Sequence, residues 1–149
     1  MQDLLQTLEK AFHNDIPYTK PLDGKIIKLN TSIAEIYFPM KENLIGNILN
    51  GNLHGGAIAT ALDSVGGLLT FAELLERMQG YTKQEIMEQM AKTSTANMYI
   101  DYLSPGKGKN FIARATTIKN GKRLFRAHMQ LFNEKNTLIA NGNGTYLFS

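Results

Sequence analysis

The sequence predicts an α+β domain in which an antiparallel sheet surrounds one buried helix. One basis is the order of hydrophobic periodicities along the chain: a short helix, two strands, an apolar helix and then a run of strands. A second is Asn120-Gly121 between two strand-like segments, a strong signal for a hairpin. The third is the absence of repeats, low-complexity tracts and linkers, which favours one domain over all 149 residues.

Composition supports a folded core and excludes several classes of protein. Hydrophobic residues make up 43% of the chain and charged residues 19%, which is typical of a globular domain. There is no cysteine, so disulfide frameworks, thiol nucleophiles and cysteine-based zinc sites are excluded. No apolar run approaches about eighteen residues, and the N-terminus lacks a basic stretch followed by an apolar one. We therefore expect a cytoplasmic protein that does not enter a membrane.

The N-terminal part predicts a helix and two strands. Apolar side chains at helical spacing mark residues 3–14 as an amphipathic helix; they are Leu4, Leu5, Leu8, Ala11 and Phe12. Pro17 and Pro21 break the helical pattern, so residues 1–20 form an N-terminal helix and linker. Residues 25–40 alternate well enough for two strands, with a turn at 30–32 and a stop at Pro39.

The middle of the chain predicts a buried helix followed by a charged one. Residues 43–56 are rich in Asn and Gly and form a structured loop, whereas residues 57–75 are apolar on nearly every side. Small residues keep this helix narrow, which predicts close packing around it; they are Ala57, Ala59, Ala61, Gly66 and Gly67. Residues 76–92 are a helical insertion, interrupted at Gly80, in which Thr82 and Glu85 form a capping box.

The C-terminal third predicts strands at 96–102, 111–119, 122–132 and 137–148. Ser104-Pro105-Gly106 ends the first of them. In the last strand, Gly142 and Gly144 predict a bulge or a close approach of another backbone.

One carboxylate stands out on the apolar helix. Asp63 is the single charged residue between Gly55 and Ala72, so it must be solvated at a cleft, paired, or raised in pKa by desolvation. Two glycines, Gly55 and Gly56, sit where the helix begins, and free N–H groups there can hold a developing oxyanion. Together, an oxyanion site at the helix start and a nearby carboxylate are the groups needed to hydrolyse an activated acyl compound. Each part alone also has a structural explanation, as a helix-face Asp or a tight turn.

Several other catalytic motifs are absent. Ser64 has Leu62 two positions before it, so there is no G-x-S-x-G nucleophile motif. Gly121-Lys122 lacks the remainder of a phosphate-binding Walker loop. The three histidines, His13, His54 and His128, show no metal-ligand spacing. We therefore expect neither a metal nor a separate cofactor.

Positive charge is concentrated at the C-terminal end. Residues 95–149 carry eight Lys or Arg against Asp101 and Glu134, a net +6, so the chain total of +3 leaves −3 for the first 94 residues. This third can meet phosphates on nucleic acid or on a phosphorylated cofactor, or it can simply be solvated strand surface. Nucleic acid is disfavoured, because Phe111, Phe125 and Phe132 have the spacing of sheet core rather than of a base-stacking platform.

The run His54-Gly55-Gly56, with Asp63 nine residues after the histidine, resembles the hotdog-fold acyl-CoA thioesterases of the phenylacetate-degradation (PaaI-like) type. The resemblance continues at residues 95–105, 120–123 and 140–146, and covers residues 25–148. It implies an antiparallel sheet wrapped around a long central helix, paired into a homodimer and often a dimer of dimers, a homotetramer. It also implies acyl-CoA as substrate and active sites at the dimer interface.

The resemblance implies a role for each site residue. Gly55 donates its backbone N–H to the thioester oxygen, and His54 shapes the loop beside it. Asp63 of the partner subunit is the nucleophile or the general base toward water, and Thr95 helps to position that water. Gly56 lies next to the bound substrate.

Two departures from the family pattern affect these assignments. The family has an Asn six residues before the histidine, where this chain has Ile48; Asn47 is slightly preferred for that role over Asn50, which then contacts the substrate. The stretch from Asp63 to Thr95 is longer than usual, so residues 76–92 supply a lid, a pocket wall or an oligomer contact.

Two basic turns are candidates for the phosphates of coenzyme A. One holds Lys107 and Lys109, and the other Lys122 and Arg123. The alternative for both is that hairpin ends carry positive charge for solubility. A non-catalytic acyl-CoA-binding protein, a sensor or carrier, is the alternative to the hydrolase, and release of free thiol separates the two.

Overall fold

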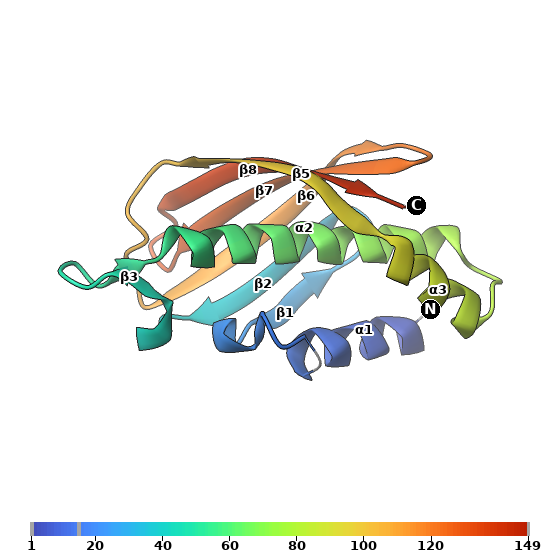
Figure 1. Ribbon diagram of the computed structural model, residues 1–149, viewed down its shortest axis with the longest axis horizontal. Coiled ribbons are helices and arrows are strands. Elements are labelled where there is room, and N and C mark those ends of the chain that lie inside the picture. Colours follow the sequence, from blue (N-terminus) through green and yellow to red (C-terminus); the bar gives the residue numbers. More distant parts are fainter. Residues whose placement is uncertain (1, 15, 149) are drawn as a thin grey trace.

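The computed structural model describes residues 2–14 and 16–148, and a six-stranded antiparallel sheet curls around one long helix, α2 (Figure 1). The strand order is β1-β2-β6-β7-β8-β5. The helices are α1 (Gln2–Asn14), α2 (Gly55–Arg77) and α3 (Lys83–Lys92); the strands of the sheet are β1 (Lys25–Leu29), β2 (Ile33–Pro39), β5 (Ser94–Tyr102), β6 (Asn110–Asn120), β7 (Leu124–Asn133) and β8 (Leu138–Leu147). The predicted α+β class, with an antiparallel sheet around a long central helix, is confirmed.

The core lies between the inner face of the sheet and α2. Burial alternates residue by residue along β2 and along most of β6 and β7, as expected for strands with one face on a helix. Small side chains on that face let the helix approach closely: Ala34, Ala113, Ala115, Ala127 and Ala140 are all fully buried. Larger side chains of the helix, such as Leu62, Val65 and Leu69, fill the space that the alanines leave.

The closest approach joins α2 to β8. The ring of Tyr146 lies across the helix, and a Cβ at Gly66 would overlap its hydroxyl. The same addition at Gly67 would meet nothing nearer than Tyr146 Cε1, at 3.8 Å. The predicted close packing around the glycines of this helix is therefore confirmed, and Gly66 is the position that requires it.

The last strand also shows the predicted close backbone approach. A Cβ at Gly142 would overlap the carbonyl oxygen of Tyr99 on β5, so glycine is needed where these two strands pair. The irregularity in their register lies elsewhere, between Thr95 and Asn97.

Several boundaries differ from the sequence prediction for physical reasons. Helix α2 starts two residues earlier than predicted, at Gly55, because His54 caps it, and it runs on to Arg77. The loop at 43–56 contains a short hairpin of β3 (Ile45–Asn47) and β4 (Asn52–Leu53). The predicted 120–121 hairpin is present with a longer turn, since Arg77 donates from Nη2 to the carbonyl of Gly121 (2.6 Å) and β7 begins only at Leu124.

The capping box of α3 is confirmed. The hydroxyl of Thr82 accepts the N–H of Glu85 (3.2 Å), and the Glu85 carboxylate accepts the N–H of Thr82 (2.8 Å). Among the described helices, only α2 is long and apolar enough to span a membrane, a property that the search for apolar runs missed. Of that apolar window, 67% is buried inside the protein, as in a core helix.

We expect Gly66→Ala to destabilise the protein and Gly67→Ala to leave it unchanged or slightly more stable. The first places a methyl group on the buried Tyr146 ring and should lower the free energy of unfolding by about 1–3 kcal/mol. The second finds room and gains roughly 0.5–1 kcal/mol of helix propensity. Urea denaturation of both variants measures the difference, and equal stabilities would contradict the close contact.

Candidate active site

The first turn of α2 has one backbone donor left over. His54 caps the helix: its Nδ1 accepts the N–H of Gly56 (2.7 Å), so the neutral ring carries its proton on Nε2. The carbonyl of His54 accepts the N–H groups of Ala57 (2.9 Å) and Ile58 (3.2 Å). Within the described part of the chain, the N–H of Gly55 has no acceptor. A free donor at a helix N-terminus suits an oxyanion.

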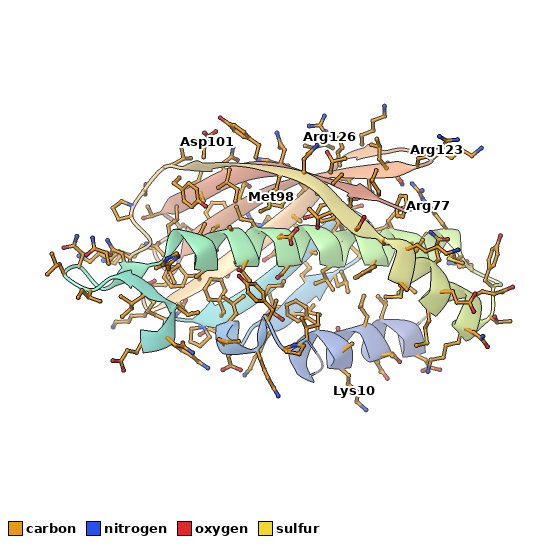
Figure 2. All side chains as sticks on the ribbon, viewed as in Figure 1. Lys10, Arg77, Met98, Asp101, Arg123 and Arg126 are labelled. Atoms are coloured by element: carbon orange, nitrogen blue, oxygen red, sulfur yellow. The ribbon has the colours of Figure 1, made fainter. Side chains whose placement is uncertain are left out.

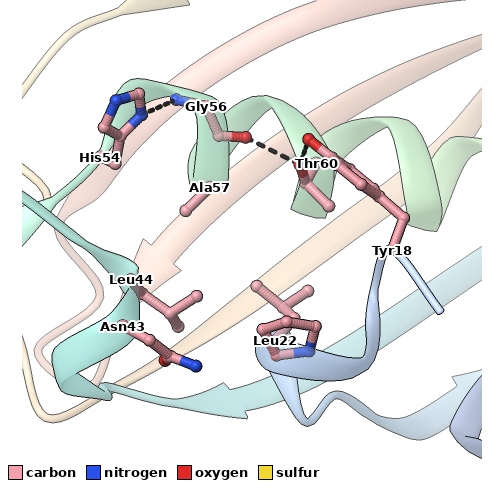
Figure 3. A pocket seen from close by; sticks show the side chains of 9 residues that line it. Tyr18, Leu22, Asn43, Leu44, His54, Gly56, Ala57 and Thr60 are labelled. Carbon is pink, nitrogen blue, oxygen red and sulfur yellow. Dashed lines mark hydrogen bonds between the residues drawn. The ribbon is translucent and has the colours of Figure 1, made fainter.

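A pocket of about 270 Å³ lies beside this turn (Figure 3). His54, Gly56 and Thr60 form one side of it, and Tyr18 and Asn43 come from segments that precede the helix. The hydroxyl of Thr60 donates to the carbonyl of Gly56 (2.8 Å) and lies 3.5 Å from that of Tyr18. The sequence analysis missed Tyr18, Asn43 and Thr60, because no motif marks them.

Asp63 lies two turns further along α2 and is held by two hydroxyl groups. The hydroxyl of Thr95, on β5, donates to Asp63 Oδ1 (3.0 Å). That of Tyr146 donates to the main-chain carbonyl of Asp63 (3.1 Å) and lies 3.4 Å from Oδ1. Burial and the charge of Asp63 raise the pKa of Tyr146 well above its ordinary value, so its hydroxyl remains a donor. Asp63 is thus half-buried, and its oxygens accept hydrogen bonds from neighbouring hydroxyl groups. Of the alternatives left open by the sequence, this corresponds to a paired carboxylate.

A groove of about 290 Å³ joins the start of the helix to Asp63. It runs along α2 from Gly56 past Thr60, with Tyr18 and Met98 among its other lining residues. Met98 lies on the α2 side of β5, whereas Asp101 projects from the outer face of that strand (Figure 2). The groove therefore connects Gly56, the residue next to the free N–H, with the carboxylate of Asp63.

The two groups are nevertheless too far apart to act on one carbonyl within a single chain. Eight residues separate Gly55 from Asp63, and at 1.5 Å per residue this is about 12 Å along the helix. A reacting carbonyl must lie within about 3 Å of both groups. One chain therefore presents two half-sites of different kinds.

The hairpin that precedes the helix places Asn47 and Asn50 in exposed positions. The side-chain oxygen of Asn47 accepts the N–H of Leu49 (3.1 Å), which stabilises the turn. No hydrogen bond among the described residues joins Asn47 or Asn50 to His54. A Cβ at Gly46 would overlap the backbone of His54, so it is β3 itself that packs against the cap.

The two basic turns lie at opposite ends of α2. The turn with Lys107 and Lys109 is next to the helix start, since the N–H of Leu53 donates to Gly106 O (2.9 Å). Hydrogen bonds from its own N–H and from that of Lys109 lower the pKa of Glu134, which keeps that carboxylate ionised against the turn. Lys122 and Arg123 lie about 33 Å away, at the end of the 23-residue helix near Arg77 (Figure 2).

No group of three or more His, Asp or Glu side chains within residues 2–14 and 16–148 is arranged to hold a metal ion.

Comparison with known proteins gives a consistent result. A family model described as the thioesterase superfamily matches residues 50–140. The medium/long-chain acyl-CoA thioesterase YigI of Escherichia coli K12 is 27% identical over 146 residues, covering 98% of this chain and 94% of that protein.

Solved structures agree. A Shewanella oneidensis protein related to the thioesterase superfamily is 36% identical, with a TM-score of 0.92 over 99% of this chain and 97% of that one. A thioesterase from Haemophilus influenzae, 20% identical, shares the fold with a TM-score of 0.76 over 96% of this chain and 88% of that one.

An antiparallel sheet curled around a long central helix, shared with these relatives, defines a thioester hydrolase with the hotdog fold. The chain belongs to the thioesterase superfamily. The expected hotdog-fold thioesterase family and the thioester hydrolase class are confirmed.

We expect His54→Ala to lower the free energy of unfolding by about 1 kcal/mol, because the N–H of Gly56 loses its acceptor. His54→Asn restores a side chain that caps helices well and should stay within a few tenths of a kcal/mol of the original protein. Urea denaturation compares the three proteins. If the Ala variant is as stable as the others, the cap contributes nothing.

Proposed function

We propose that this protein hydrolyses acyl-CoA thioesters to the free acid and coenzyme A, at sites shared between two copies of the chain. The observation that carries the proposal is the pair of half-sites on α2: a free N–H at Gly55 and a hydroxyl-bonded carboxylate at Asp63. The name of the Escherichia coli relative, a medium/long-chain acyl-CoA thioesterase, supports the substrate class. The His54-Gly55-Gly56 run with Asp63 supports the PaaI-like type.

The reaction needs only these groups. The N–H of Gly55 and the positive end of the helix dipole stabilise the negative charge that develops on the thioester oxygen. Asp63 of the second copy either attacks the carbonyl carbon, giving an anhydride that water then hydrolyses, or removes a proton from the attacking water. In both routes the carbon–sulfur bond breaks, the CoA sulfur takes up a proton and water supplies the new oxygen.

Thr95 and Tyr146 hold the carboxylate in place. Because the hydroxyl of Thr95 donates its proton to Asp63, its lone pairs remain available to accept a hydrogen bond from the attacking water. Tyr146, which the sequence analysis did not assign, fixes the helix and the carboxylate from the other side.

A second copy is expected along β5, the nine-residue edge strand that carries Thr95. Its outward edge is open, and three large side chains on or next to it are more than half exposed: Tyr99, Tyr102 and Leu103. An open strand edge with apolar side chains favours pairing with another strand. Pairing here brings the second chain next to Asp63, which the shared site requires, and a homotetramer follows if two such dimers associate.

We expect Asp63→Asn to lower kcat by a factor of about 100 or more, with the fold unchanged, because the amide keeps its shape but is neither a nucleophile nor a base. Asp3→Asn, at an exposed position near the start of α1, is the matched control and should keep full activity. Release of free thiol from a panel of acyl-CoAs measures both.

Full activity of Asp63→Asn would contradict the assignment. If the unaltered protein binds acyl-CoA without releasing free thiol, the protein is an acyl-CoA carrier or sensor and not a hydrolase.

Mixing two inactive variants tests the shared site directly. Gly55→Pro removes the proposed oxyanion donor at the first helical position, where proline is well tolerated and where His54 already has extended backbone angles. An equal mixture with Asp63→Asn, unfolded and refolded together, forms mixed dimers that have one intact site, so about a quarter of the activity returns. No recovery would mean that each site lies within one chain.

We expect one of the two basic turns to bind the phosphates of coenzyme A. Replacing Lys107 and Lys109 by Ala, or Lys122 and Arg123 by Ala, should raise KM for acyl-CoA with little change in kcat for the pair that contacts phosphate; the other pair is the control. The effect should shrink at high salt and vanish with an acyl-pantetheine substrate. Equal losses on both substrates would assign the residues a structural role.

A further inference from the structure

An apolar chamber of about 280 Å³ opens behind the carboxylate of Asp63. Its polar lining residues, Asp63, Ser64 and Thr95, gather at one end. The other described lining residues are apolar. Most come from three helices, with Leu8 and Phe12 of α1, Leu68 and Phe71 of α2, and Met90 of α3, and Ile16 follows α1. A cavity with a reacting group at one end and apolar walls beyond it suits a ligand with one polar and one long apolar part.

The two outer helices of the chamber are held by different contacts. Leu8 and Phe12 are almost fully buried in the hydrophobic core, although α1 lies at the surface alongside α2 (Figure 1). Helix α3 is fixed by Ile86, which is 2% exposed, and by the side chain of Gln89, which donates to the carbonyl of Phe148. These contacts leave Met90 partly buried at the chamber.

We propose that this chamber holds the acyl chain of the thioester, and that Gly67 and Met90 set the length of chain that fits. The proposal rests on the hydrolase function proposed above. Along α2 the chamber extends from Asp63 to Phe71, which is about 12 Å. A cavity of about 150 Å³ accommodates the six carbons of benzene, so 280 Å³ corresponds to a chain of roughly ten carbons.

Gly67 and Met90 line the chamber at positions where a change of side chain alters the volume of the chamber. A Cβ at Gly67 meets only Tyr146 Cε1, at 3.8 Å, so a larger side chain there extends into the chamber. Met90 contributes a flexible thioether from the opposite helix, and its removal lengthens the space. Among the described residues, the deeper wall carries no polar side chain, so a charged or hydroxylated acyl tail pays a desolvation penalty and an unsubstituted chain is preferred.

The experiment measures kcat/KM for straight-chain acyl-CoAs of four to sixteen carbons. For the original protein we expect about a fourfold rise per methylene up to roughly ten carbons, because burial of one methylene is worth about 0.8 kcal/mol, followed by a plateau or a fall. Gly67→Val should lower decanoyl-CoA hydrolysis at least tenfold and leave butanoyl-CoA within twofold. Met90→Ala should raise tetradecanoyl-CoA hydrolysis several-fold. Met87→Ala, on the exposed side of α3 (58% exposed), is the matched control with an unchanged profile.

An unchanged chain-length profile in both Gly67→Val and Met90→Ala overturns the proposal. Failure of the hydrolase function gives a different result, the absence of thiol release from every acyl-CoA by the original protein. Calorimetric titration of decanoyl-CoA in the Asp63→Asn background tests the chamber without turnover: Gly67→Val should weaken binding at least tenfold, and equal affinities would also overturn the proposal. Gly67→Ala, which adds one methyl group, should give an intermediate effect.

Discussion

The close contact between α2 and the sheet is the constraint on which the rest of this structure depends. Alanines on the inner strand faces and a glycine at position 66 let the helix lie against the strands, and the Tyr146 ring occupies the space that any larger residue at 66 would take. The same contact brings the Tyr146 hydroxyl to Asp63. Because Thr95 reaches Asp63 from β5, which pairs with β8, the position of the carboxylate is set by the packing that buries the core. Stability and geometry of the site therefore share one cause.

Along α2, the N–H of Gly55 and the carboxylate of Asp63 are too far apart to reach one carbonyl within a single chain. The start of α2 offers an N–H free of internal partners, since the His54 ring and carbonyl satisfy the next three donors, and the carboxylate follows about 12 Å later. Strand β5, which carries Thr95, is the edge strand of the sheet and bears exposed aromatic rings. In the shared site proposed above, a second copy along that edge would cover the strand and provide the complementary half-site.

Short-range signals in the sequence were sufficient to predict much of the fold and part of the candidate site. The Thr82–Glu85 capping box, the hairpin near Asn120 and the isolated Asp63 each follow from short-range rules of spacing and charge. The contributions of Tyr146, Asn43 and Tyr18 were not predictable in the same way, because each depends on segments that meet only in three dimensions. The end of the predicted hairpin turn is a similar case: Arg77, more than forty residues earlier, binds its carbonyls. The position of Met90, within residues 76–92, beside residues of α1 is likewise visible only in the fold.

The chamber wall and the reacting groups come from different parts of the chain. Asp63 and Thr95 are held between α2 and the sheet, whereas Leu8, Phe12 and Met90 come from the two outer helices, α1 and α3, of which α1 packs Leu8 and Phe12 into the core. Mutations in α1 or α3 can therefore accumulate without disturbing the hydrogen bonds around the carboxylate. If the chamber holds the acyl chain as proposed, this division would let descendants of one ancestral gene change substrate preference through substitutions in α1 and α3, with the hydrogen bonds around Asp63 kept.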